Sequence, residues 1–106
     1  MNSSDTTIDL RTMQASAERA CGLLKRLANP DRLLIMCRLS QGELSVGELE
    51  EQLGIRQPTL SQQLAVLRES DLVNARREGK NIFYSVASVQ ALAVMAVLYE
   101  QFCSES

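Results

Sequence analysis

Apolar residues recur every three or four positions along residues 10–28, a heptad-like pattern that predicts a long first helix. The repeated positions are Leu10, Met13, Ala17, Ala20, Leu24 and Leu27. Asn29 and Pro30 separate it from a second helix, because proline disfavours helical backbone just before it and suits a first helical turn. The second helix, predicted over residues 30–40, is apolar on nearly all sides and therefore belongs at the centre of the core.

Two shorter helices joined by a tight connection are expected next, over residues 45–53 and 58–69. Ser45 and Glu48 match a capping box at the start of the first of them, and Gly54 can end it. In the second helix, three leucines fall on one buried stripe: Leu60, Leu64 and Leu67. Two helices connected in this way are typical of a helix-turn-helix.

The hydrophobic period then falls from about 3.6 to about 2 residues, which predicts a β-hairpin. Its strands cover residues 72–77 and 82–86, and Gly79 suits the turn between them. Ser88 caps a last helix that extends to about residue 102 and is apolar on most of its surface, so this helix needs a partner. We therefore predict a mainly α-helical winged helix-turn-helix, with about five helices and a two-stranded wing, that forms a homodimer through its first and last helices.

The length and composition narrow the class of protein. We expect residues 1–106 to form one domain, with residues 1–9 flexible. No apolar run is long enough for a membrane span and no secretion signal is visible, which predicts a cytoplasmic protein whose three cysteines are thiols: Cys21, Cys37 and Cys103. The sequence contains no histidine, no glycine-rich phosphate loop and no clustered carboxylate pair. We therefore expect neither an enzyme nor a cofactor.

The net charge of −2 conceals an uneven distribution. Residues 55–80 carry five basic and three acidic side chains, so the positive excess falls on the second helix of the helix-turn-helix and on the hairpin. The polar face of that helix carries amides and hydroxyls, which both donate and accept hydrogen bonds, as reading of base edges requires. The candidate DNA-contacting residues are Thr59, Ser61, Gln62, Gln63 and Arg68 on the helix, and Arg76, Arg77 and Lys80 on the hairpin. The bland alternatives are a solvated helix face and a charged hairpin edge.

Four segments carry a resemblance to a known family: residues 24–35 (LKRLANPDRLLI), 44–49 (LSVGEL), 57–64 (QPTLSQQL) and 72–80 (LVNARREGK). They resemble the ArsR/SmtB family of winged-helix repressors, and the match extends from about residue 15 to residue 103. The resemblance implies a bacterial dimer that binds double-stranded operator DNA and leaves it when an inducer binds.

The chain departs from this family at its usual metal sites. The predicted third helix has no cysteine, and the last helix has no histidine and few acidic residues, so we expect no metal at those sites. Cys37 and Cys103 are placed similarly to cysteines of the thiol-based subgroup of BigR, SqrR and HlyU regulators. That resemblance implies that persulfides or polysulfides join Cys37 and Cys103 through a polysulfide bridge and so weaken DNA binding.

Several alternatives remain open for the thiols and for the fold. In the first alternative, Cys37 is a small apolar residue of the core and not a sensor. Cys21 lies near the seam of the first helix and is interpreted as a packing residue. A repressor of the same fold that responds to a soft metal, a metalloid or general oxidants is another. A winged-helix protein–protein interaction module is a third, and loss of affinity with added salt would distinguish DNA binding from it.

Overall fold

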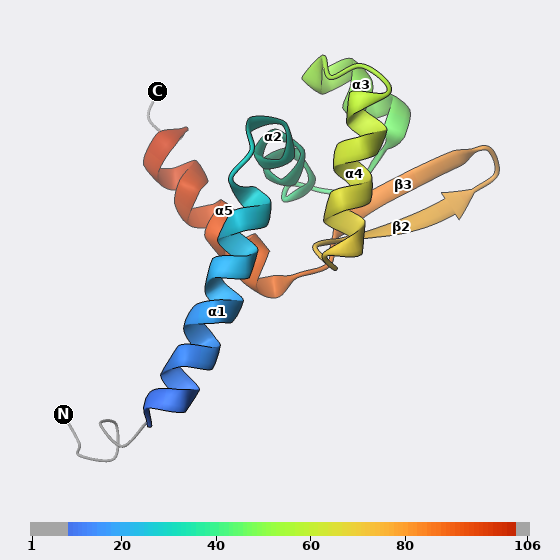
Figure 1. Cartoon of the computed structure of the whole chain (residues 1–106). Coiled ribbons are helices and arrows are strands. Elements are labelled where there is room, and N and C mark those ends of the chain that lie inside the picture. The colour runs from blue at the N-terminus through green and yellow to red at the C-terminus, as the bar shows by residue number, and fades with distance from the viewer. Residues whose placement is uncertain (1–8, 104–106) are drawn as a thin grey trace.

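The computed structural model describes residues 9–103, and within them the chain forms five helices and three strands (Figure 1). In chain order they are α1 (Leu10–Leu27), α2 (Pro30–Leu39), β1 (Leu44–Ser45), α3 (Val46–Leu53), α4 (Thr59–Glu69), β2 (Val73–Glu78), β3 (Asn81–Val86) and α5 (Val89–Phe102). The segment predicted to be flexible, residues 1–9, lies outside the described residues except for Asp9. The Asp9 carboxylate caps α1 by accepting a hydrogen bond from the Thr12 backbone N–H at 2.8 Å.

Side-chain caps set most of the helix starts where the sequence predicted them. Asn29 caps α2, and Ser45 and Glu48 form the predicted reciprocal capping box at α3. Ser88 caps α5 by accepting a hydrogen bond from the Ala91 backbone N–H. Gly54 ends α3 with a φ of 70°, a left-handed backbone conformation that suits glycine.

The wing contains one strand more than the sequence predicted. Strands β2 and β3 form the expected antiparallel hairpin, in which Gly79 adopts a φ of 65° in the turn. The short strand β1 pairs with the other side of β3, with Leu44 opposite Tyr84, so the sheet has three strands in the order β1-β3-β2. A strand of two residues is too short to show an alternating hydrophobic pattern, which explains why the sequence did not reveal it.

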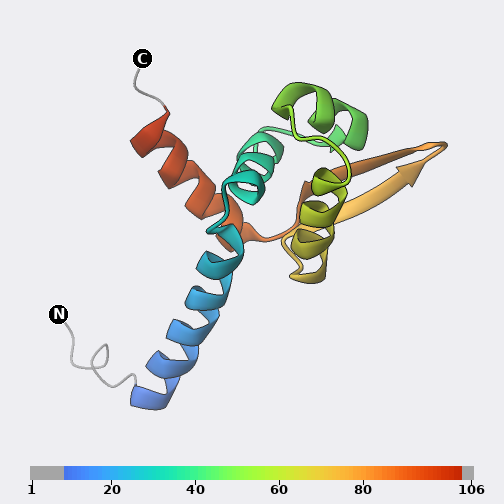
Figure 2. The same cartoon turned by 45° about the horizontal axis from the view of Figure 1, so that its top comes forward.

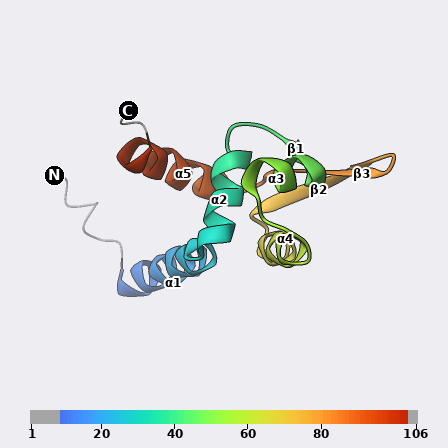
Figure 3. The ribbon, with the colours of Figure 1, turned by 90° about the horizontal axis from the view of Figure 1, so that it is seen from above.

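Helix α2 occupies the centre of the domain, as its apolar sequence predicted. It contacts α1, α3, α4, α5 and β3. Figures 2 and 3 show α2 between α5 on one side and the α3–α4 pair on the other. The fully buried side chains around it are Ile35, Met36, Leu49, Leu60, Leu64, Leu67 and Met95. This core fixes α3 and α4 against each other and leaves the outer face of α4 open.

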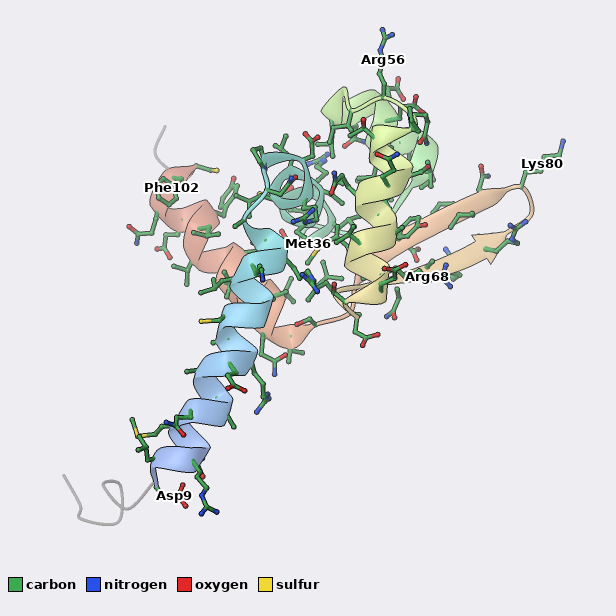
Figure 4. The ribbon with its side chains drawn as sticks, in the orientation of Figure 1. Asp9, Met36, Arg56, Arg68, Lys80 and Phe102 are labelled. Carbon is green, nitrogen blue, oxygen red and sulfur yellow. The ribbon has the colours of Figure 1, made fainter. Side chains whose placement is uncertain are left out.

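Helices α1 and α5 leave much apolar surface uncovered within one chain. Only Leu27 of α1 is buried, and the helix extends away from the domain toward Asp9 (Figure 4). The exposed large apolar residues are Leu10, Met13 and Leu24 on α1, Leu34 on α2, and Val89, Leu92, Val97, Tyr99 and Phe102 on α5. None of the helices within residues 9–103 has the length and apolar character that a membrane span requires.

Candidate nucleic-acid interface and cysteine pair

Helix α4 buries one face and presents the opposite face to solvent. Its three leucines at 60, 64 and 67 are at most 1% exposed, as their spacing predicted. Among the predicted DNA-contacting residues of α4, Ser61, Gln62 and Arg68 are exposed, whereas Thr59 and Gln63 are half-buried. The tertiary structure therefore divides the predicted polar face into three outward-facing side chains and two that lie partly against the domain.

The first turn of α4 is closed by a residue that the sequence analysis did not single out. Helix α4 starts at Thr59, one residue later than predicted, with Pro58 in the cap position. The Gln57 side-chain oxygen accepts hydrogen bonds from the Ser61 backbone N–H (3.1 Å) and from the Ser61 hydroxyl (2.6 Å). Arg56 projects beyond this end of α4 (Figure 4). Its charge contributed to the basic segment of the sequence, but nothing in the local pattern distinguished it from a solvated arginine.

Gln63 is linked to the helix at the centre of the domain. Its side-chain oxygen accepts a hydrogen bond of 2.8 Å from the guanidinium of Arg32 on α2. The same guanidinium donates through Nε to the backbone carbonyl of Arg26, near the end of α1, at 2.6 Å. One arginine thus connects α1, α2 and α4.

The three predicted wing cations differ in their surroundings. Arg76 forms ion pairs with Glu43 (2.8 Å) and Glu78 (2.9 Å), and its guanidinium lies 4.8 Å from the centre of the Phe83 ring. The hydrogen bonds from Arg76 to Glu43 and Glu78 raise the pKa of Arg76. The bond to Glu43 also lowers the pKa of the Glu43 carboxyl. All three cations are exposed, but within residues 9–103 ion pairs are observed only for Arg76 among them, and Lys80 lies at the tip of the wing (Figure 4).

A groove of about 580 Å³ brings the outer face of α4 and the wing together. Ser61, Ala65 and Arg68 line it from α4, and Lys80 and Tyr84 line it from the hairpin. Three of the predicted DNA-contacting residues, from segments far apart in the sequence, thus border one groove. The two cations, Arg68 and Lys80, suit the phosphate oxygens of a nucleic acid, whereas the Ser61 hydroxyl already donates its proton to Gln57.

Cys37 and Cys103 lie at the ends of two neighbouring helices. Cys37 is half-buried on α2, and Cys103 is exposed directly after α5, which contacts α2. Burial raises the pKa of the Cys37 thiol, and the negative charge of the nearby Cys103 thiolate raises it further. Arg38, whose proximity in sequence suggested an activating cation, lowers the pKa of Cys37 by the smallest effect, and its guanidinium donates to the side chains of Gln52 and Gln41.

The third cysteine, Cys21, lies on a different helix from the other two. Cys21 is exposed on α1, so its predicted packing role requires a partner chain. Across residues 9–103, no three or more cysteine, aspartate or glutamate side chains gather in a way that could hold a metal ion.

A helix-turn-helix with an exposed polar second helix and a basic hairpin beside it defines a winged helix-turn-helix DNA-binding regulator. The chain belongs to the ArsR family of bacterial regulators. The family model described as "Bacterial regulatory protein, arsR family" matches residues 29–75. The Biofilm growth-associated repressor of Agrobacterium fabrum is 54% identical over 92% of this chain and 83% of its own length.

Solved structures of family members agree with this assignment. The crystal structure of the transcriptional repressor BigR from Xylella fastidiosa is 48% identical and matches with a TM-score of 0.84, over 92% of this chain and all of its own. Reduced HlyU from Vibrio cholerae is 42% identical and matches with a TM-score of 0.86, over 90% of this chain and all of its own. These relatives are transcriptional regulators and not enzymes. Homodimers occur in the family, as in the winged helix-turn-helix domain of Mb0332 from Mycobacterium bovis. That structure is 29% identical and matches with a TM-score of 0.73, over 90% of this chain and 88% of its own.

Proposed function

We propose that this chain is a dimeric repressor that leaves operator DNA when reactive sulfur species modify Cys37 and Cys103. The observation that carries the proposal is the placement of these two thiols, far apart in sequence, on contacting helices and close enough for the charge of one to affect the other. The relative from Agrobacterium fabrum is named a repressor, and the HlyU structure is described as reduced, which supports both a repressor role and a redox-dependent state.

The different exposure of the two cysteines gives the reaction an order. Exposed Cys103 reacts first: its thiolate attacks the sulfur next to one end of a polysulfide H2Sn, with n of at least three, and displaces hydrosulfide, so that Cys103 carries the other n − 1 sulfur atoms as a hydropolysulfide. The Cys37 thiolate then attacks the sulfur next to the terminal SH of that hydropolysulfide, and a second hydrosulfide leaves as the bridge closes. In total, two thiols and one polysulfide H2Sn give a bridge that retains n − 2 sulfane sulfur atoms and release two molecules of hydrogen sulfide. The polysulfide is the oxidant, and both thiol protons leave in the hydrogen sulfide.

The bridge acts on DNA binding through α2. A covalent link between the ends of α5 and α2 restrains these two helices against each other. Helix α5 is predicted to form the dimer, and α2 contacts α4, to which its Arg32 donates a hydrogen bond. A dimer binds two half-sites about one helical turn of DNA apart. A change in the angle between α5 and α2 therefore alters how well the α4 helices of the two subunits fit the major groove. Modification by the inducer thus lowers the affinity for DNA, and bound DNA in turn disfavours the modified arrangement of α5 and α2.

We assign DNA contacts to the outer face of α4 and to the wing. Helix α4 enters the major groove, where Thr59, Ser61, Gln62 and Gln63 are the proposed base-reading residues. Arg68, Arg77 and Lys80 neutralise backbone phosphates. Arg76 is bound to Glu43 and Glu78, so we assign to it the positioning of the wing.

Arg77→Ala is expected to weaken binding to specific and non-specific DNA alike and to reduce the slope of log affinity against log salt by about 1, because one phosphate contact is lost. The measurement is fluorescence anisotropy of labelled duplexes over a series of salt concentrations. Arg11→Ala is the matched control, since it removes the same charge from an exposed position on α1. An equal change of slope in both variants would assign the effect to net charge and contradict a wing contact.

We further propose that α1 and α5 form the dimer interface, because they carry most of the exposed large apolar residues. Val97 on α5 is 57% exposed in the single chain. Val97→Glu is expected to raise the dimer dissociation constant at least about tenfold, since a two-fold interface would bury two unpaired carboxylates. Analytical ultracentrifugation measures the constant, and Asn74→Glu, the same charge change on exposed β2, is the control. A Val97→Glu protein that dimerises as tightly as this control would exclude Val97 from the interface.

The sulfur chemistry is tested by the intact mass of reduced protein after treatment with polysulfide, with peroxide or with a soft metal under native conditions. The expected product gains whole sulfur atoms, loses two hydrogens and yields a cross-linked peptide that contains Cys37 and Cys103. A cross-link with peroxide but not with polysulfide would instead indicate a general oxidant sensor. A retained metal ion would indicate a soft-metal repressor, and separate modification of the two thiols would contradict the pair.

A further inference from the structure

We propose that Arg32 determines which end of the Gln63 side-chain amide can reach DNA, and that Arg32 is therefore a specificity-determining residue of this regulator. The inference rests on the proposed recognition of DNA by α4. It deepens that proposal, because it predicts the chemistry of one base contact from a hydrogen bond inside the protein.

The Arg32 guanidinium is held in place on two sides. Its Nε donates to the Arg26 carbonyl at 2.6 Å, and one terminal nitrogen donates to the Gln63 side-chain oxygen at 2.8 Å. Arg32 and Gln63 are both half-buried. The Arg32 backbone N–H also donates to the Asn29 cap at 3.1 Å, which fixes the start of the helix from which the side chain extends. The guanidinium is therefore a preorganised donor directed at α4.

The chemistry of the two groups permits one orientation of the amide. A guanidinium has donors and no acceptor, so the Gln63 oxygen must face Arg32. The Gln63 NH2 group is then the part of the amide that remains for a ligand. Glutamine normally reads adenine with both ends, since its oxygen accepts from N6 and its nitrogen donates to N7. With its oxygen turned toward Arg32, Gln63 presents its NH2 group to DNA and acts mainly as a donor, although the oxygen keeps a second lone pair.

A glutamine that presents mainly its donor end distinguishes bases differently from a free glutamine. Guanine presents two acceptors in the major groove, O6 and N7, whereas adenine presents one acceptor beside a donor. Gln63 should therefore favour guanine over adenine at the base pair that it contacts. Without Arg32 the amide can turn, so adenine becomes as good a partner as guanine.

The test uses an operator selected from a random duplex pool by the reduced wild-type protein, with each base pair then substituted in turn. Wild-type protein is expected to favour guanine over adenine roughly tenfold at one position of each half-site. Arg32→Met should bring this ratio close to 1 at that position. Gln63→Met should do the same, and the double variant should match Gln63→Met, because Arg32 acts through Gln63.

Arg38→Met is the matched control. Arg38 extends from the same helix but donates to Gln52 and Gln41, not to α4, so its removal should leave the ratio unchanged. Gln63→Glu provides a second test that keeps the buried contact, because a carboxylate can still pair with Arg32. It leaves an acceptor for DNA, so the preference at this position should change from guanine to cytosine, whose N4 amino group donates.

Each failure has a distinct meaning. An Arg32→Met protein that keeps the guanine preference, or a Gln63→Glu protein that does not change it, overturns the inference. If Gln63→Met leaves the preference intact while Gln62→Ala abolishes operator binding, α4 still reads DNA but Gln63 does not, which also overturns the inference. If both variants bind the operator as wild type does, recognition by α4 itself is refuted.

Discussion

Cys37→Ser protein is expected to remain on operator DNA at a polysulfide concentration that releases the wild-type protein. The hydroxyl cannot close a bridge to Cys103, so modification of Cys103 no longer restrains α5 against α2. Typical coupling energies between two sites correspond to a change in affinity of about 5- to 150-fold, and we expect this change to disappear in the variant. Anisotropy of a labelled operator, before and after polysulfide and again after a thiol reductant, measures it.

Two further cysteine variants make this test specific. Cys103→Ser should be equally insensitive, because the bridge needs both thiols, whereas Cys21→Ser should respond as wild type does. Cys21 is exposed on α1, and the thiolate whose charge raises the pKa of Cys37 is that of Cys103, so Cys21 controls for general thiol modification. Before treatment, all three reduced variants should bind DNA with wild-type affinity. Release of Cys37→Ser by polysulfide would show that another site senses the inducer.

Leu64→Ala is expected to lower the free energy of unfolding by about 2 to 5 kcal/mol, because it removes a buried side chain and leaves a cavity in the core. Leu64 is 1% exposed and belongs to the stripe that holds α4 against the core. A loss of this size is a large part of the stability of a typical small domain. Urea unfolding, followed by circular dichroism at one fixed protein concentration, measures it, since dimerisation makes stability depend on concentration.

Gln62→Ala is the matched variant on the opposite face of the same helix. Gln62 is exposed, so its replacement should change stability by no more than about 0.5 kcal/mol. Loss of a base contact should instead cost about 1 to 3 kcal/mol of specific DNA binding. The two variants thus separate the folding of α4 from its recognition of DNA. Equal losses of stability in both would show that the assignment of buried and outward faces is wrong.

Much of the fold could be predicted from the sequence because the signals are local. The capping box of Ser45 and Glu48 lies within one helical turn, and the buried stripe of α4 follows from the period of the helix. The hairpin was indicated by a change of period and by a glycine in its turn. The predicted apolar surplus of α1 and α5 is also observed. Such features depend on residues only a few positions apart, so the chain specifies them before it folds.

The candidate site could be predicted only in part. The sequence indicated which segment carries the polar face, and Ser61, Gln62 and Arg68 are exposed there. It could not show that the Gln63 amide is bound by Arg32, 31 positions earlier, or that Arg76 is held by Glu43, 33 positions earlier. Each of these four side chains appears equally free when its own segment is considered alone.

The sequence by itself therefore determined the five helices, the caps of α2, α3 and α5, the hairpin and the buried stripe of α4. The tertiary structure alone decided the pairing of β1 with β3, the groove between α4 and the wing, and the proximity of Cys37 to Cys103. The physical reason is that periodicity and capping act within a few residues, whereas these contacts depend on how whole elements pack. The angles between α2, α4 and α5 are set by the shared core around Ile35 and Met36, and no local pattern encodes them.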